Sequence, residues 1–301
     1  GWDPDYDGNL GSYRAVNLVR DTLGLLHALG RREVAAVVGH DFGASVAAWC
    51  ALMRADVFRS MVLMSAPYAG SPSLPFDTAN GAAMPVAGED IHSALAALPR
   101  PRKHYQWYYS TRAADADMQH CAQGVHAFLR AYFHHKSADW TNNKPHELQS
   151  WSASELAQMP TYYIMDLEQN MAQTVAAHMP SDAAVSACQW LSDDELIVYS
   201  LEYSRQGFQG ALQWYRCRTS GQFNSELEVF TGRTIDVPSC FIAGASDWGV
   251  YQTPGALQAM QQRVCTRFER CHLLPGAGHW VQQEQPGAVN DALLKFLATL
   301  G

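Results

Sequence analysis

Polar residues of two types follow apolar runs in this sequence, and their order suits covalent catalysis. Asp41 lies in the pattern Gly-x-Asp-x-Gly, directly after a run of small apolar residues. Asp247 follows a second apolar run, and His279 follows a third. A nucleophile needs a base nearby, and the base needs an acid that orients it. The order therefore predicts Asp41 as the nucleophile, Asp247 as the orienting acid and His279 as the general base.

The two glycines around Asp41 are typical of a sharp turn that links a buried strand to a helix. The backbone of such a turn is strained, and we expect a side chain at Gly39 or Gly43 to collide with the strand or the helix. The free N–H groups at the start of the helix favour negative charge at the turn. A simpler interpretation makes Asp41 a helix cap, Asp247 a loop cap and His279 a surface residue. Three matches in order and in context favour the catalytic interpretation.

The segments around Asp41 have the hydrophobic patterns of a strand–helix–strand unit. Apolar residues recur at helical spacing over 10–29. The continuous apolar run 34–38 predicts a strand buried on both faces, and a helix of small residues is expected over 44–54. A strand over 60–64 completes a βαβ unit. Residues 1–66 are therefore predicted as the first part of an α/β core.

The middle of the chain, residues 67–232, has a different composition. It opens with a stretch rich in Pro and Gly and continues with aromatic-rich helical patterns, without alternating strands. We predict a mainly helical cap, with helices over 118–135 and 193–218 among others. Residues 233–301 then return to the first pattern and are predicted as the second part of the core. The elements expected there are a strand over 237–244, a helix over 254–263, a strand over 267–274 and a helix over 286–300.

Four stretches carry a resemblance to a known family: VVGHDFGA, IAGASDWGV, GAGHWVQQEQP and GFQGALQWYR. Together they resemble the epoxide hydrolases of the α/β-hydrolase superfamily, and the likeness extends over essentially the whole chain. The resemblance implies an α/β-hydrolase core, with a mostly parallel sheet flanked by helices, and an inserted helical cap. It implies hydrolysis of an epoxide to a vicinal diol, with a small apolar epoxide and water as partners and a detoxifying role. No cofactor and no metal are expected.

Two cap tyrosines hold the epoxide oxygen in this family, and the resemblance gives these roles to Tyr105, in HYQWYY, and Tyr215, in LQWYR. Ring opening turns the epoxide oxygen into a strongly basic alkoxide. A phenol with a pKa of about 10 stays protonated at pH 7 and still gives its proton to that oxygen. Packing between cap helices is the simpler interpretation. Tyr108 and Tyr109 lie close enough in the sequence to leave the first assignment open.

The residue types imply a route in two steps. Asp41 attacks the less hindered epoxide carbon and forms an alkyl ester. His279, held by Asp247, deprotonates a water that attacks the ester carbonyl, and the backbone N–H of Phe42 stabilises the oxyanion. Aspartate suits this task because its ester has a carbonyl that water can attack, whereas a serine ether would be a dead end.

One departure from the family concerns the beginning of the sequence. The first four strands of an α/β-hydrolase are not found here, and the segment 1–3 resembles the loop after the fourth. We interpret this as omission of an N-terminal portion. The missing part is expected to carry the His-Gly-x-Pro loop, which supplies the second oxyanion donor. The strand before Asp41 is then expected to have an unpaired edge.

Two other functions compete with this interpretation. Haloalkane dehalogenases share the aspartate nucleophile, but their halide pocket usually has Trp directly after it, where this sequence has Phe42. A non-catalytic ligand-binding homologue is the second alternative, which the three intact triad residues disfavour. A serine esterase does not fit because Ser45 lies past the turn, inside the predicted helix.

Composition excludes several other classes. The net charge is −8 and Lys and Arg do not cluster, which disfavours nucleic acid and anionic membranes as partners. The seven cysteines are scattered without a CxxC pair, which indicates free thiols and predicts a cytoplasmic location. No apolar run approaches the roughly 20 residues of a membrane span. The sequence leaves open whether the protein assembles as a homodimer.

Overall fold

The computed structural model describes residues 9–81 and 90–300. Its parallel sheet consists of β1 (Val37–His40), β2 (Met61–Met64), β5 (Ser239–Gly244) and β6 (Phe268–Leu274). The elements before β5 are η1 (Leu10–Tyr13), α1 (Ala15–Ala28), α2 (Phe42–Met53), α3 (Ile91–Ala96), β3 (Arg102–His104), α4 (Tyr105–Ser110), α5 (Ala113–Gln119), α6 (Gly124–Lys136), α7 (Ala153–Leu156), β4 (Ile164–Asp166), α8 (Met171–Ala176), α9 (Asp182–Ala187), α10 (Asp193–Gln206), α11 (Gln209–Thr219) and α12 (Asn224–Glu228). The elements after β5 are η2 (Trp248–Val250), α13 (Ala256–Ala259), η3 (Met260–Val264), α14 (Val281–Glu284) and α15 (Pro286–Ala298).

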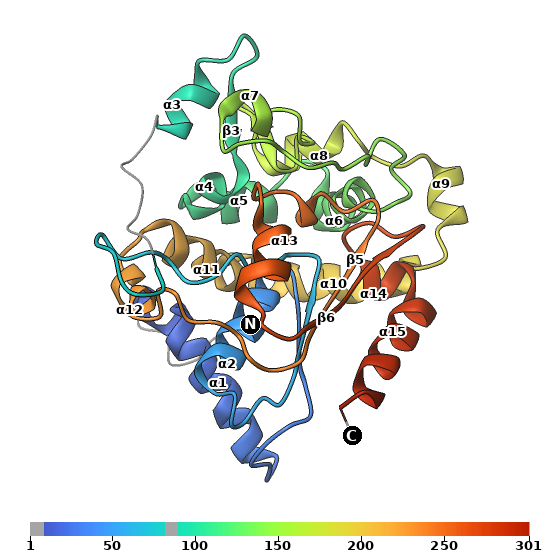
Figure 1. Cartoon of the computed structure of the whole chain (residues 1–301). Helices are drawn as coiled ribbons and strands as arrows, with labels where there is room; N and C mark the ends of the chain where they lie inside the picture. The colour runs from blue at the N-terminus through green and yellow to red at the C-terminus, as the bar shows by residue number, and fades with distance from the viewer. Residues whose placement is uncertain (1–8, 82–89, 301) are drawn as a thin grey trace.

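The four parallel strands lie in the order β1-β2-β5-β6 and are covered by helices on both faces. Side chains of a strand alternate between the faces of its sheet. Leu63 of β2 and Phe241 of β5 therefore pack toward α1 and α2, whereas Val62 and Ile242 pack toward α14 and α15. Figure 1 shows α1 and α2 on one side of β5 and β6, and α15 on the other. The predicted mostly parallel sheet flanked by helices is confirmed.

The strand before Asp41 lies at the edge of this sheet. Among the described residues β1 pairs only with β2, as the sequence led us to expect. Val38 is 42% exposed, so the expectation of a strand buried on both faces over 34–38 is wrong. A strand with one neighbour is covered on one side only, which leaves part of its surface open. The segment 1–3, compared above with a family loop, lies outside the described residues.

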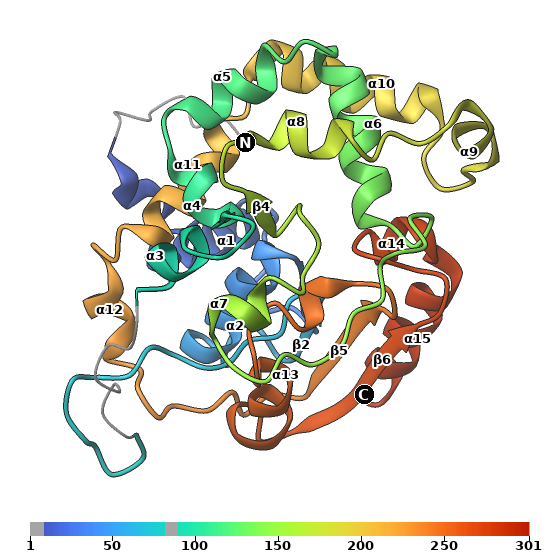
Figure 2. The same cartoon turned by 90° about the horizontal axis from the view of Figure 1, so that it is seen from above.

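The chain between β2 and β5 is mainly helical, and it forms its own buried cluster. Figure 2 shows α5, α8 and α10 grouped together, with α6 reaching from this group toward α14. Two strands of three residues each, β3 and β4, also pair in this part as a small antiparallel sheet that the sequence did not predict. The helix expected over 118–135 is broken before Gly124, where φ is +76°. The one expected over 193–218 is broken at Gly207, where φ is +67°. The proposed division at 67 and 232 stays a prediction.

The strand directions decide where polar side chains gather. All four strands are parallel, so their carboxyl ends meet at one edge of the sheet. Asp41 follows β1, Ser65 follows β2, and Asp247 and His279 lie in the loops after β5 and β6. Residues more than two hundred positions apart in the sequence are brought together there.

Candidate active site

Asp41 occupies a strained turn between β1 and α2. Its φ is 55° and its ψ is −123°, a backbone conformation that residues other than glycine rarely adopt. A Cβ at Gly39 would lie 2.0 Å from the carbonyl oxygen of Gly43, so the turn requires glycine at position 39. The same expectation for Gly43 is wrong, because a Cβ there meets no described atom within 4 Å apart from its chain neighbours and the backbone of its own helix. The helix begins at Phe42, two residues before the predicted start.

The first turn of α2 presents backbone donors beside Asp41. Within the described chain the N–H of Phe42 has no hydrogen-bond acceptor, as is usual for the first residues of a helix. The Phe42 ring is 40% exposed and packs on Trp214, with the ring centroids 5.1 Å apart. This N–H is therefore available to an oxygen on Asp41.

His279 lies between the two aspartates, and both it and Asp247 are 2% exposed. Its Nδ1 is 3.3 Å from Oδ1 of Asp247 and 2.9 Å from Oγ of Ser65. A carboxylate only accepts hydrogen bonds, so Nδ1 carries the ring proton and Nε2 is left as the base. Nε2 is 4.0 Å from Oδ2 of Asp41. The three predicted triad residues are thus brought together, with Ser65 added to them.

The charges of the site hold both carboxylates in their ionised form. Burial acts to raise the pKa of Asp41, but the nearby His279, Lys136 and His40 outweigh it and leave the pKa below its ordinary value. The pKa of Asp247 is lowered in the same way, because His279 and the hydrogen bond from the Gly249 N–H outweigh burial. Ionised Asp41 is the form able to attack carbon.

The loop that carries His279 is fixed by hydrogen bonds from three directions. Glu284 accepts the N–H groups of Gly278 and Trp280, on either side of His279, at 2.9 and 3.0 Å. The N–H of His279 donates to the carbonyl of Lys136, the last residue of α6, at 2.9 Å. His40 Nε2 donates to the carbonyl of His279 at 2.7 Å. The imidazole is therefore positioned by its own loop, by the strand of the nucleophile and by the helical insertion.

Tyr105 of α4 and Tyr215 of α11 lie close to Asp41. Their ring centroids are 5.9 Å apart, and the hydroxyl of Tyr105 donates to Oε1 of Gln252 at 3.2 Å. Burial raises the pKa of both phenols above the ordinary value, and the charge of Asp41 adds to the effect. The hydroxyl of Tyr108 instead donates to Asp117 at 3.0 Å.

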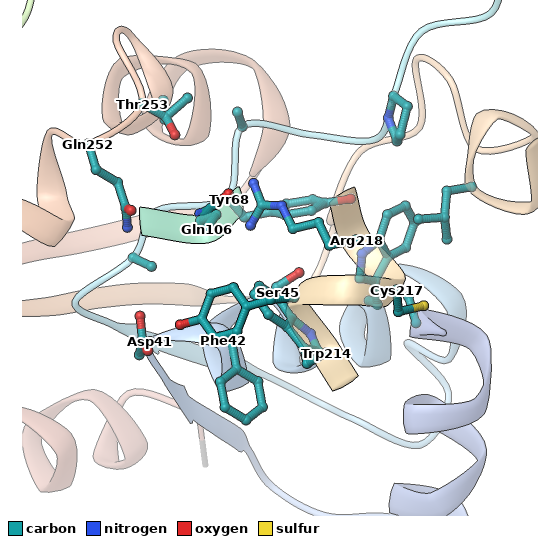
Figure 3. Close-up of a pocket in the computed structure, with 18 of the residues that line it drawn as sticks. Asp41, Phe42, Ser45, Tyr68, Gln106, Trp214, Cys217, Arg218, Gln252 and Thr253 are labelled. Atoms are coloured by element: carbon teal, nitrogen blue, oxygen red, sulfur yellow. The ribbon is translucent and has the colours of Figure 1, made fainter. Parts of the chain in front are cut away.

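A cavity of about 300 Å³ lies against Asp41 and these two tyrosines. Asp41, Tyr105 and Tyr215 line it, whereas Tyr108 and Tyr109 do not, which favours Tyr105 as the first cap tyrosine. Aromatic rings form much of its wall, as expected for a pocket that takes an apolar molecule. Figure 3 shows Asp41 and Gln252 near one end of the cavity and Cys217 at the other.

The structure adds four residues that the sequence interpretation missed: Ser65, Lys136, Gln252 and Glu284. Ser65 directly follows a predicted strand, so its position at the carboxyl edge was a usable signal. Glu284 lies five residues after His279 in the resemblance motif itself. Nothing in the local sequence of Lys136 or Gln252 indicates where their side chains lie, because their neighbours come from distant segments.

Comparison with known proteins decides the family. The family described as alpha/beta hydrolase fold matches residues 3–286. Epoxide hydrolase A of Mycobacterium tuberculosis is 30% identical over 293 residues, which make up 96% of this chain and 76% of that protein. The chain belongs to the epoxide hydrolases of the α/β-hydrolase family.

Two further members of this family show the same extent of similarity. Epoxide hydrolase B of M. tuberculosis is 27% identical over 96% of this chain and 78% of its own length. The solved structure of an epoxide hydrolase from an endophytic Streptomyces is 28% identical, covers 97% of this chain and 76% of its own, and has a TM-score of 0.72. The predicted resemblance, α/β-hydrolase fold and enzyme class are confirmed.

Within 9–81 and 90–300, no three His, Cys, Asp or Glu side chains gather as a metal site. None of the helices in that part of the chain has both the length and the apolar character needed to cross a membrane.

Proposed function

We propose that the protein hydrolyses an epoxide to a vicinal diol through an ester of Asp41. One observation carries the proposal: Asp41, whose carboxyl has a lowered pKa, lines the same cavity as Tyr105 and Tyr215, whose phenols have raised pKa values, and the imidazole of His279 is 4.0 Å from the carboxylate. Epoxide opening needs a nucleophile at carbon and a proton donor at oxygen. The names of the relatives agree with this chemistry.

In the first step Asp41 attacks one epoxide carbon, and the C–O bond of the ring breaks. Negative charge moves from the carboxylate to the epoxide oxygen, which Tyr105 and Tyr215 protonate or hold by hydrogen bonds. The raised pKa of the phenols keeps them protonated before the reaction. An alkoxide is far more basic than a phenolate, so proton transfer to it stays downhill.

In the second step His279 takes a proton from a water, and the resulting hydroxide adds to the carbonyl carbon of the Asp41 ester. Asp247 stabilises the imidazolium that forms, and the N–H of Phe42 is placed to stabilise the oxyanion. The ester bond to the diol oxygen then breaks, the hydroxyl proton of the adduct passes to that departing oxygen, and the Asp41 carboxylate is regenerated. The proton held by the imidazolium returns to the tyrosine that protonated the epoxide oxygen, which restores the resting enzyme. One oxygen of water thereby enters Asp41.

A single turnover in oxygen-18 water tests this route, with mass analysis of the peptide that contains Asp41. We expect one labelled oxygen in that peptide and no label in the diol. Diol formation without label in Asp41 would show that water attacks the epoxide directly. Parallel assays of halide release from a haloalkane distinguish a dehalogenase. Tight ligand binding without any product would favour the non-catalytic alternative.

The substrate we propose is a small apolar epoxide, because aromatic and small apolar residues line much of the cavity, although Arg14, Arg218 and several amide side chains also reach it. No cofactor or metal takes part in the proposed steps. A homodimeric assembly and a cytoplasmic location stay predictions from the sequence.

A further inference from the structure

A buried lysine lies beside the proposed catalytic centre without a part in the route above. Lys136 ends α6 and is only 4% exposed. Its Nζ lies over four aromatic rings, each within 6 Å of the ring centroid. The rings are those of Tyr132 at 5.4 Å, Tyr162 at 5.7 Å, Tyr163 at 5.1 Å and Trp280 at 5.6 Å. Ring faces are negative, so this cage holds an ammonium as a cation.

The cage leaves the charge of Lys136 without a carboxylate partner. In the described chain its ammonium makes no ion pair and no side-chain hydrogen bond. A cation buried in this way is costly unless negative charge lies within reach of its field. The rings solvate it only partly, which points to a charge elsewhere in the site.

Backbone contacts hold Lys136 against the triad. Its carbonyl accepts the N–H of His279 at 2.9 Å. Asn143 donates to the carbonyls on both sides, those of His135 and Ser137, at 3.0 and 2.7 Å. The end of α6 therefore cannot shift without moving the loop of the catalytic imidazole.

The triad supplies negative charge near the cage. Trp280, whose ring centroid is 5.6 Å from Nζ, packs on His279 with the ring centroids 4.7 Å apart, and Nε2 of His279 is 4.0 Å from Asp41. Asp41, whose side chain is 28% exposed, and the buried Asp247 bring two carboxylates together, while His279 must be neutral to act as a base. Other titratable groups around the cage are His40, His279, Glu284, the caging tyrosines and His135, whose ring packs on Tyr162 at 4.8 Å between the ring centroids. Lys136 is among the groups that lower the pKa of Asp41, second after His279.

We propose that Lys136 is the counter-charge of the nucleophile, an electrostatic positioning residue that keeps Asp41 ionised. This inference rests on the ester route proposed above. In the resting site the ammonium offsets one of the two negative charges. During ester hydrolysis it also favours the oxyanion that develops on the Asp41 carbonyl. Its field acts through the site without contact with the reacting atoms.

The test is the pH dependence of ester formation with enzyme in excess over a styrene-type epoxide, measured after a rapid jump from pH 7. Ester formation uses Asp41 but not the base His279. The fall of its rate at low pH, its acid limb, therefore reports the protonation of Asp41. In Lys136→Met we expect the fall in the rate of ester formation to occur at higher pH. At the lowest pH values the rate should drop by roughly tenfold relative to the wild type, because loss of a nearby opposite charge raises an aspartate pKa by at least about 1. Lys136→Arg, which retains the charge, should restore the limb.

Arg130 gives the matched control. It is a second buried cation of α6, 7% exposed, but it pairs with Asp193. Arg130→Met should reduce stability while it leaves the acid limb of ester formation in place. An unmoved limb in a folded Lys136→Met variant would overturn the proposal, as would an equal shift in Arg130→Met.

The wild-type protein supplies a measurement that does not depend on the folding of variants. The proposal requires its acid limb to lie below the ordinary aspartate pKa of about 3.9. A limb above that value overturns the role of Lys136 even if every variant unfolds. Absence of any ester in the wild-type enzyme would instead reject the proposed function, so the two failures are distinguishable.

Discussion

At the scale of single residues, the site combines a carboxylate that stays charged with phenols that stay neutral. Both states have the same origin in burial and neighbouring charge. His279, Lys136 and His40 outweigh burial at Asp41, whereas burial and the charge of Asp41 raise the pKa of the tyrosines together. The resting site is thereby set for attack on carbon with proton delivery to oxygen.

Replacement of Tyr215 should affect the first chemical step alone. We expect Tyr215→Phe to slow ester formation by about 100-fold, at the low end of general acid catalysis, because Tyr105 remains. Folding should be spared, since the ring is retained. Rapid-mixing kinetics give the rate, and Tyr108→Phe is the control because its hydroxyl bonds Asp117 outside the cavity. An unchanged rate in Tyr215→Phe would remove that residue from its role.

Ser65 should matter in the second step. Its Oγ lies 2.9 Å from Nδ1 of His279, so its removal loosens the imidazole. We expect Ser65→Ala to slow ester hydrolysis by about 3- to 10-fold, the worth of one hydrogen bond, with ester formation unaffected. The ester of Asp41 should then accumulate and be visible by mass. Ser60→Ala removes a buried serine hydroxyl directly before β2. This variant should not change the rate of ester hydrolysis relative to ester formation.

At the scale of elements, the catalytic loop depends on a helix from the insertion. Two carbonyls at the end of α6 accept hydrogen bonds from this loop. The carbonyl of Lys136 accepts the N–H of His279, and the carbonyl of Phe133 accepts the indole N–H of Trp280 at 2.9 Å. Gly278 allows this approach, because a Cβ there would lie 2.6 Å from the carbonyl oxygen of Lys136. The base is therefore placed jointly by the sheet and by the helices over it.

Glu284 is the residue whose loss should release this loop. Its carboxylate accepts three backbone N–H groups, the third from Ala138 at 2.8 Å. A glutamine side chain turns donors toward some of these N–H groups. We expect Glu284→Gln to cost about 1–3 kcal/mol of unfolding free energy and to lower kcat with KM little changed.

Denaturant titration and steady-state kinetics measure the two effects. Glu202→Gln, at an exposed residue of α10 paired with Arg205, is the matched control and should change neither. If Glu284→Gln keeps both wild-type values, the loop is held by other contacts.

At the scale of the whole molecule, two hydrophobic layers enclose the sheet, and a third cluster fills the insertion. The triad carboxylates lie where these clusters meet. Asp247 has a lowered pKa in the folded protein, so its contribution to stability is present above the ordinary aspartate value and is lost as pH falls below it.

Asp247→Asn should therefore reveal a stability difference that depends on pH. We expect the unfolding free energy of the wild-type protein to exceed that of the variant at pH 7 and pH 5. The difference should shrink as pH falls below about 3.9, where unfolded aspartate takes up its proton. Urea titrations at these pH values measure it. A difference that stays constant down to pH 3 would show that Asp247 does not titrate with folding.

Much of the core was predictable because short-range rules govern it. The apolar runs and helical spacing placed β2, β5, β6, α2 and α15 to within a few residues. Errors arose where tertiary neighbours decide. The strand before Asp41 is half-exposed because, in the part of the chain that the structure describes, β2 is the only strand beside it. β3 pairs with a partner sixty residues away that shows no strand pattern.

The sequence by itself predicted three triad residues that the structure brings together, because residue type, chain order and position after strands are all local features, and parallel strands bring such positions to one edge. The fold also followed from it, through the resemblance. Only the tertiary structure decided that Tyr105 and not Tyr108 lines the cavity, that Ser65 touches the imidazole, and that Lys136 lies in an aromatic cage. Those relations depend on how helices of the insertion pack against loops far away in the chain, and no local pattern encodes such contacts.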